Sequence, residues 1–131
     1  KTWAPSNLKR AKNWPTPKEM KIKDIQKVIK QFTNTSKLAF KAGYDGVEIH
    51  MAHGYLLHEF CSPITNKRID KYGLHSENFK LPIDILKSIK KNLPKKKIIG
   101  ARITATDHLS NGIKISDSIS LINKLKKNGL N

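Results

Sequence analysis

The amino-acid sequence predicts an α/β fold with parallel strands. Three observations support this prediction. Apolar residues recur at helical spacing in three stretches of the chain. Two short runs rich in valine and isoleucine lie between those stretches. The resulting order over residues 21–131 is helix, strand, helix, strand, helix, and this alternation is typical of parallel α/β architecture.

The composition is that of a soluble globular domain. The 131 residues are 37% hydrophobic and 27% charged, with a net charge of +16. Arginine occurs only at positions 10, 68 and 102, and the lysines are spread over the predicted helices, so we expect no specific nucleic-acid partner. No apolar run approaches the roughly 20 residues that cross a membrane. Because Cys61 is the single cysteine and no secretory signal opens the chain, we expect a cytoplasmic protein.

The first half of the chain predicts an arm, a helix and a strand. Residues 1–20 contain three prolines and two tryptophans, which indicates an ordered loop or arm because such dense prolines exclude helix interiors and central strands. A helix is expected from about Asp24 to a stop at Gly43. Residues 46–50 then predict a strand, and residues 55–60 a short helix within a long connection.

The second half predicts two further helices around a second strand. Ser76 is the expected N-cap of a helix that ends before Pro94, with Pro82 either bending it or marking its beginning. Residues 97–103 predict a strand buried on both faces. Ser116 or Asp117 is expected to cap the last helix, which stops at Gly129, and the final two residues lead toward another strand.

Two strands do not complete a parallel sheet, because both outer edges stay unpaired. We therefore expect residues 1–131 to be the central part of a single larger domain. A complete (β/α)8 barrel takes about 250 residues, so the chain predicts roughly half of one. The first residue is a lysine, and we expect the sequence to begin inside a longer reading frame.

The residues best suited to chemistry follow the first strand. Ligands of parallel α/β folds bind beyond the carboxyl ends of the strands. His50 lies at that end, and His53 and Tyr55 follow closely. Two imidazoles can donate hydrogen bonds to a carbonyl or nitro oxygen, and a phenol can protonate a carbanion. These three side chains predict one substrate pocket.

Other polar residues leave alternatives open. Glu48 shares a strand face with His50, which permits a metal site with His53, but we expect none. His58-Glu59 begins like a zinc-peptidase helix, but Ser62 stands where the second histidine belongs.

Arg102 and Cys61 can each have a structural or a functional role. Arg102 near the end of an apolar strand either pairs with Glu48 or Asp107, or faces a ligand that carries negative charge. Cys61 is expected to pack as a small apolar residue, because no cation stands near it along the predicted helix.

The chain resembles the Old Yellow Enzyme family of flavin-dependent oxidoreductases, and among them the bacterial NADPH dehydrogenase and xenobiotic reductase branch. The resemblance rests on residues 42–60, on segments 16–20 and 101–107, and on single positions between them. These read Gly46-Val47-Glu48-Ile49-His50-Met51-Ala52-His53-Gly54-Tyr55, then His58-Glu59-Phe60, Ser62-Pro63, Asn66, Arg68, Asp70 and Tyr72-Gly73. It covers nearly the whole chain, and it departs from the family at Leu74-His75 and Phe79.

The resemblance implies a function and a place in the fold. The family is a (β/α)8 barrel that holds FMN, and this chain would supply its fourth and fifth strands with their helices. His50 and His53 match the residues that bind the substrate oxygen, Tyr55 matches the proton donor, and Arg102 matches the arginine beside the flavin. NADPH or NADH would be the hydride donor, and α,β-unsaturated carbonyl or nitro compounds the substrates.

The resemblance also implies partners. The remainder of the barrel is required, and the full-length protein is a possible homo-oligomer. The alternative to an enzyme is a truncated, non-catalytic remnant that acts only by associating with a partner chain through its sheet edges.

Overall fold

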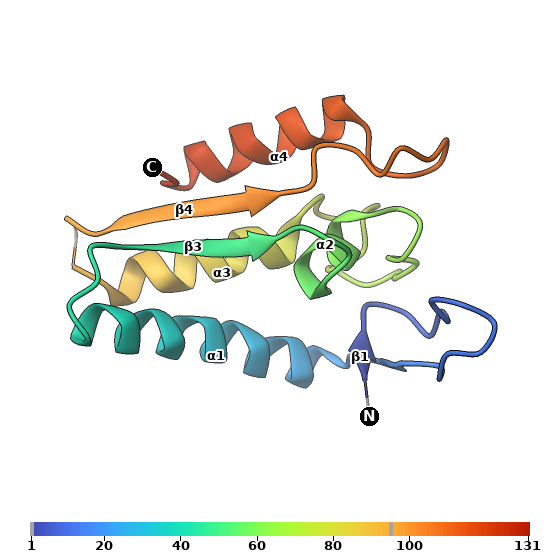
Figure 1. Ribbon diagram of the computed structural model, residues 1–131, viewed down its shortest axis with the longest axis horizontal. Coiled ribbons are helices and arrows are strands. Elements are labelled where there is room, and N and C mark those ends of the chain that lie inside the picture. The colour runs from blue at the N-terminus through green and yellow to red at the C-terminus, as the bar shows by residue number, and fades with distance from the viewer. Residues whose placement is uncertain (1, 95) are drawn as a thin grey trace.

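The computed structural model describes residues 2–94 and 96–131, and its main feature is a parallel strand pair with helices packed on one face (Figure 1). β3 (Gly46–Met51) and β4 (Ile98–Ile103) lie side by side in unbroken register, from Gly46 opposite Ile98 to Met51 opposite Ile103. α1 (Ile22–Lys41), α3 (Lys80–Asn92) and α4 (Ile115–Lys127) pack around the pair, and the short α2 (Leu56–Cys61) follows β3. The predicted order of helices and parallel strands is thus present.

One face of the strand pair is covered and the other is open. Ile49, Met51 and Ile99 are buried in the core together with apolar residues of α1, α3 and α4. On the opposite face Glu48 and Arg102 are exposed, and Ile98 is 56% exposed. The expectation that residues 97–103 are buried on both faces was therefore wrong within this chain. The reason is that, among the described residues, helices pack only on the face lined by odd-numbered residues.

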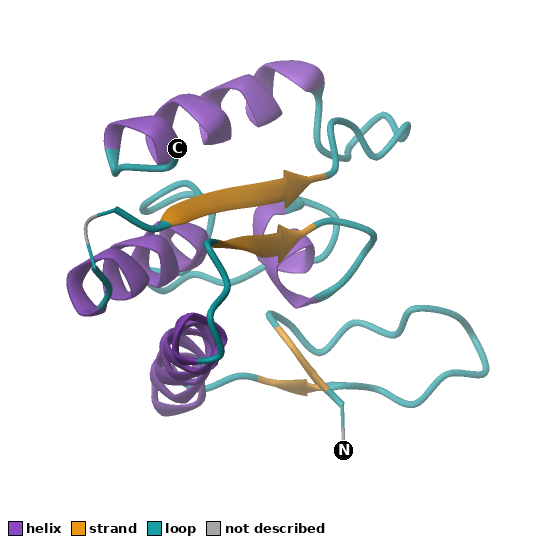
Figure 2. Ribbon diagram, turned by 60° about the vertical axis from the view of Figure 1, so that its left-hand side comes forward, coloured by secondary structure: helices purple, strands orange, loops and turns teal. Residues whose placement is uncertain are grey.

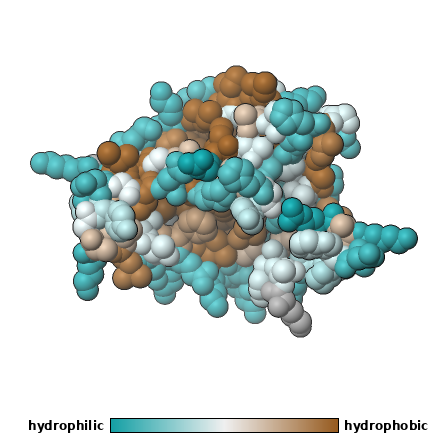
Figure 3. Space-filling view, in the orientation of Figure 1, coloured by the Kyte–Doolittle hydropathy of each residue, from teal (hydrophilic) through white to brown (hydrophobic). Residues whose placement is uncertain are grey.

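The helices spread across the covered face toward both edges of the strand pair. Figure 2 shows α1, almost end-on, toward the β3 edge and α4 toward the β4 edge. Figure 3 shows hydrophilic side chains in the middle of the viewed face and apolar surface around them and over α4. α4 leaves three isoleucines exposed, Ile115, Ile119 and Ile122. No helix within the described residues is long and apolar enough to span a membrane.

The N-terminal arm contains a minimal pairing of its own. β1 (Trp3–Ala4) and β2 (Lys18–Glu19) form a two-residue parallel pair at the two ends of the proline-rich segment. The guanidinium of the buried Arg68 donates to the carbonyl oxygens of Pro5 at 2.8 Å and Met20 at 2.7 Å. The arm is therefore fixed to the connection that follows α2.

Helix α1 begins and ends close to the predicted positions. The Lys21 N–H donates to Asp24 Oδ2 at 2.9 Å, which satisfies a backbone donor before the first turn. At the other end Gly43 has φ +97°, and the N–H groups of Gly43 and Tyr44 donate back to carbonyls of the last turn. A left-handed glycine after the last turn is a common helix stop.

The predicted N-caps of the other two long helices were wrong. α3 begins at Lys80 with Phe79 as N-cap, and not at Ser76. Pro82 explains the difference, because it has no N–H and is tolerated in the first turn but not in the interior that a start at Ser76 would give it. α4 has Lys114 as N-cap, whose N–H donates to Asp117 Oδ2 at 2.9 Å, so Asp117 acts from the third helical position.

The last residue already adds to the strand pair. The Asn131 N–H donates to the Ile99 oxygen at 3.2 Å, and the Ile99 N–H donates to Asn131 Oδ1 at 2.9 Å. Asn131 thus lies along the edge of β4 that β3 does not occupy, but residues 130–131 do not form the predicted strand within the described part of the chain.

Candidate active site at the carboxyl ends of the strands

His50, His53 and Tyr55 come together at the carboxyl end of β3. The ring centroids of His50 and His53 are 5.2 Å apart, and those of His50 and Tyr55 are 5.6 Å apart. The Tyr55 side chain is among the exposed ones, at 63%. All three residues that the sequence singled out therefore share one surface with a phenol open to solvent.

A tight turn produces this convergence. Ala52 is fully buried after the strand, and the next two residues have positive φ, +61° at His53 and +72° at Gly54. The Tyr55 N–H donates back to the Ala52 oxygen at 3.2 Å. Tyr55 is then the N-cap of α2, so the turn brings the phenol back beside the strand end.

Arg102 lies next to the histidines on the neighbouring strand. It stands opposite His50 in the register of β3 and β4, and its Nε donates to Glu48 Oε1 at 2.7 Å. Of the two partners that the sequence left open, Glu48 is the one present. The arginine side chain is 56% exposed, whereas the sequence predicted a buried strand, because no further strand among the described residues covers this face. Among the described residues only its Nε is engaged, so four guanidinium N–H donors have no hydrogen-bond partner there.

The sequence reasoning missed a second polar cluster behind the turn. The Gly54 N–H donates to His58 Nδ1 at 2.7 Å, and His58 Nε2 lies 2.7 Å from Asp107 Oδ1. Because Nδ1 accepts, the proton of the neutral ring is on Nε2, which donates to the carboxylate. Ser62 Oγ and the Ile113 N–H also donate to Asp107.

This cluster fixes the charge of Asp107. Burial favours the neutral acid, but the hydrogen bonds from Ile113, Ser62 and His58 outweigh it and lower the pKa of Asp107. The signal in the sequence was weak, since Asp107 is 49 residues away from His58. Only the family resemblance drew attention to both residues, because His58 and Asp107 each lie in a segment that is similar to the family.

The alternatives to a substrate pocket find less support. The described residues contain no group of three histidine, cysteine, aspartate or glutamate side chains placed to hold a metal ion. Both nitrogens of His58 are hydrogen-bonded within the protein, so it is not an available ligand. Cys61 is buried, and burial raises the pKa of its thiol to about 12, which keeps it protonated and unreactive.

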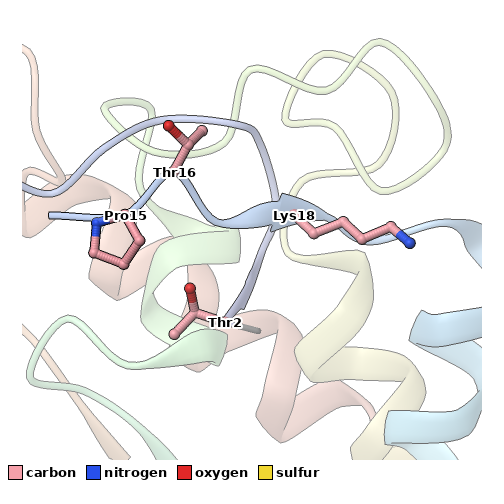
Figure 4. A pocket seen from close by; sticks show the side chains of 4 residues that line it. All are labelled: Thr2, Pro15, Thr16 and Lys18. Atoms are coloured by element: carbon pink, nitrogen blue, oxygen red, sulfur yellow. The ribbon is translucent and has the colours of Figure 1, made fainter.

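A cavity of about 370 Å³ has Glu48 and His50 in its lining. Two others lie at the polar cluster and in the N-terminal arm. One, of about 430 Å³, is lined by the cluster residues His58, Ser62 and Asp107 together with Arg10 and Glu59. Burial raises the pKa of Glu59, and the charge of Arg10 partly opposes this. The other, of about 560 Å³, lies in the arm between Thr2, Pro15, Thr16 and Lys18 (Figure 4), and none of the residues at the strand ends lines it.

Comparison with known proteins defines the class. The sequence profile of the NADH:flavin oxidoreductase / NADH oxidase family matches residues 2–131. The chain belongs to this family. The family description names NADH and flavin, and its relatives below are NADPH dehydrogenases, so FMN and NADPH or NADH are the cofactors that membership implies.

Particular relatives are similar over almost the whole chain. An NADPH dehydrogenase of Geobacillus thermodenitrificans is 35% identical over 128 residues, or 97% of this chain and 37% of that protein. An NADPH dehydrogenase of Clostridium acetobutylicum is 39% identical over 125 residues, or 94% of this chain and 37% of that protein. The chain thus spans about 37% of the length of these relatives.

Solved structures agree with the fold. A 2-naphthoyl-CoA reductase in complex with 2-naphthoyl-CoA superposes with a TM-score of 0.88 at 27% identity, covering 96% of this chain and 19% of that one. A morphinone reductase variant in complex with tetrahydroNAD superposes with a TM-score of 0.81 at 24% identity, covering 98% of this chain and 40% of that one. The mixed α/β arrangement with parallel strands is therefore shared with these enzymes.

Proposed function

We propose that this chain is the substrate-binding part of an FMN-dependent NAD(P)H oxidoreductase of the ene-reductase type. It would form about the fourth and fifth strands of a (β/α)8 barrel, with the rest of the barrel on the open face and outer edges of the strand pair. The observation that carries the proposal is the convergence of His50, His53 and Tyr55 beside Arg102 at the carboxyl ends of two parallel strands.

The donor set fits a flavin. Reduced flavin carries negative charge, and a guanidinium beside the ring stabilises it. Arg102 offers such a cation with unengaged Nη groups, and Glu48 fixes its orientation through Nε. FMN, when bound, supplies the hydride that NADPH or NADH has delivered to it.

The protein residues have separate roles in the proposed reaction. His50 and His53 donate hydrogen bonds to the carbonyl or nitro oxygen of the substrate, which draws electrons from the double bond. Tyr55 donates its phenolic proton to the α-carbon as negative charge develops there. Tyr55 is 63% exposed in this chain, so solvent can return the proton after each cycle.

The proposed reaction has two halves, reduction of the flavin by NADPH and its reoxidation by the substrate. The proposal assigns Tyr55 to the second half alone, and this is testable in the full-length protein that contains this chain. In Tyr55→Phe we expect reduction of the flavin by NADPH to stay nearly unchanged, because no proton is donated in that step. Reoxidation by 2-cyclohexenone should slow by about 100-fold, which is a usual contribution of a general acid. Anaerobic stopped-flow absorbance of the flavin measures both rates.

Tyr44→Phe is the matched control. Tyr44 is equally exposed but precedes β3, at the opposite end of the strand. Equal slowing of both half-reactions in Tyr55→Phe would contradict the donor role. A full-length protein that neither binds flavin nor oxidises NADPH would instead favour the non-catalytic remnant that associates with a partner chain.

A further inference from the structure

The turn that carries His53 and Tyr55 is held by two connections to the loop after β4. The His53 N–H donates to Thr104 Oγ1 at 3.0 Å. The Gly54 N–H donates to His58 Nδ1 at 2.7 Å, and His58 continues to Asp107 at 2.7 Å. The second connection thus runs from the backbone of the turn through an imidazole to a carboxylate on the other loop.

Asp107 is a rigid anchor for this connection. Its side chain is 9% exposed, and it accepts hydrogen bonds from Ser62 Oγ and from the Ile113 N–H, each at 2.8 Å. Its own N–H donates to the Ile113 oxygen at 3.0 Å. Gly112 packs against it so closely that an added Cβ would lie 2.4 Å from the Asp107 Cβ. An acceptor held on this many sides fixes whatever hydrogen-bonds to it.

The turn needs such an anchor because its backbone is unfavourable. His53 is not a glycine, yet its φ is +61°, and Gly54 follows with φ +72°. A non-glycine residue in the left-handed region costs about 1 kcal/mol or more and persists only where surrounding contacts impose it. His58 engages the Gly54 N–H inside this pair of residues.

We propose that His58 is a positioning residue for the substrate pocket, which acts with Asp107 to fix the turn at residues 53–54 and through it the His53 ring and the Tyr55 hydroxyl. The inference rests on the proposed function, since it assigns the purpose of the anchor to substrate binding. His58 itself touches no substrate in this scheme, because both of its nitrogens are engaged within the protein.

Two conservative variants separate the two bonds of His58. In His58→Asn the side-chain oxygen takes the place of Nδ1, so the Gly54 contact is kept and the Asp107 contact is lost. In His58→Gln the amide nitrogen takes the place of Nε2, so the reverse holds. His58→Ala removes both. Ser88→Ala is the control, because it removes the 2.7 Å Thr33–Ser88 hydrogen bond between α1 and α3, at a site outside the turn.

The first measurement concerns the turn and needs no flavin chemistry. Hydrogen–deuterium exchange at the Gly54 amide in the full-length protein should rise at least about tenfold in His58→Ala and His58→Gln, the cost of losing one partly buried hydrogen bond. Ser88→Ala should leave it unchanged. Unchanged exchange in both His58 variants would overturn the proposal. If His58→Ala does not fold, His58→Gln decides.

The second measurement concerns the pocket. Binding of 4-nitrophenol to the FMN-loaded protein should weaken about 10- to 100-fold in all three His58 variants, as expected when a binding group is displaced by about 1 Å. Flavin reduction by NADPH should change far less. If the wild type binds no 4-nitrophenol, the proposed function fails, while the exchange result still decides on the anchor. If wild type and variants bind it equally, the positioning role is wrong.

Discussion

Asp107 shows how one carboxylate links stability to the site. It accepts from His58, Ser62 and the Ile113 N–H while little exposed. Hydrogen bonds to a charged group contribute about 1.5 to 3 kcal/mol. In asparagine, the NH2 group would replace one carboxylate oxygen and would face a group that is itself a hydrogen-bond donor. At neutral pH we expect Asp107→Asn to lower the free energy of unfolding by about 2 kcal/mol.

The pH dependence follows from the direction of the shift. Despite burial, the hydrogen bonds lower the pKa of Asp107, so its stabilisation is complete above the unfolded value of about 3.9 and is lost as pH falls through the lower folded value. The difference in unfolding free energy between wild type and Asp107→Asn should therefore be constant from about pH 7 to pH 5 and shrink below about pH 4.

Urea unfolding across this range measures the difference. Asp45→Asn is the control, since the Asp45 side chain is 97% exposed and should leave stability unaltered. A difference between wild type and Asp107→Asn that persists undiminished down to about pH 3 would mean that the charge of Asp107 is not what stabilises the fold.

The sequence predicted that His50, His53 and Tyr55 lie together, but it did not predict the hydrogen bonds that hold their turn. His50, His53 and Tyr55 are close in the sequence and follow a strand, so their meeting is a local consequence of one turn. The sequence left Glu48 and Asp107 as the two candidate partners of Arg102, and Glu48 is the one present. His58 was considered only as a metal ligand, because its actual partner Asp107 comes from another loop and no local spacing encodes that contact.

At the scale of elements, the strands and helices were predictable and their beginnings were not. Periodic apolar residues define where a helix packs, but the first residue depends on which backbone N–H groups find acceptors. Phe79 illustrates this, since it is a buried phenylalanine with φ +66° at the N-cap of α3. No propensity favours such a residue there, and its burial in the core compensates for the backbone conformation.

The connection between α2 and α3 depends on close backbone approach at Gly73. A Cβ added there would lie 2.1 Å from the Arg68 carbonyl oxygen and 2.8 Å from its carbon. These are backbone atoms, and the Arg68 side chain beside them is buried, so the strain has no easy release. We expect Gly73→Ala to lower the free energy of unfolding by about 1 to 3 kcal/mol, the usual cost of overpacking.

Gly100→Ala is the matched control for this substitution. A Cβ at Gly100 meets nothing nearer than the Val47 oxygen at 4.0 Å within this chain. Chemical denaturation of both variants of the 131-residue chain, in which the face that carries Gly100 is open, measures the contrast. If Gly73→Ala were as stable as the wild type, the connection would have to be free to move away from Arg68.

At the scale of the whole molecule, the strand pair has one open face. This agrees with a chain that spans about 37% of the length of its relatives. The face carries Glu48, His50 and Arg102, and Asn131 already follows the free edge of β4. A parallel pair with two unpaired sides and one uncovered face is a poor end state for a folded protein. The proposed barrel resolves this, because further strands would pair with both edges and enclose the polar face.

The same reasoning predicts that these 131 residues alone bind FMN poorly. Within the described residues we assign one group, Arg102, to the flavin, and none to its phosphate. A single exposed guanidinium that is already paired with Glu48 provides little affinity, since surface ion pairs contribute about 1 kcal/mol or less. Titration of FMN with the isolated chain, followed by flavin fluorescence, should show no saturation at equimolar concentrations, whereas the full-length protein should quench it stoichiometrically. Tight stoichiometric binding by the isolated chain would require a phosphate site among these residues and would contradict the division of labour proposed for the barrel.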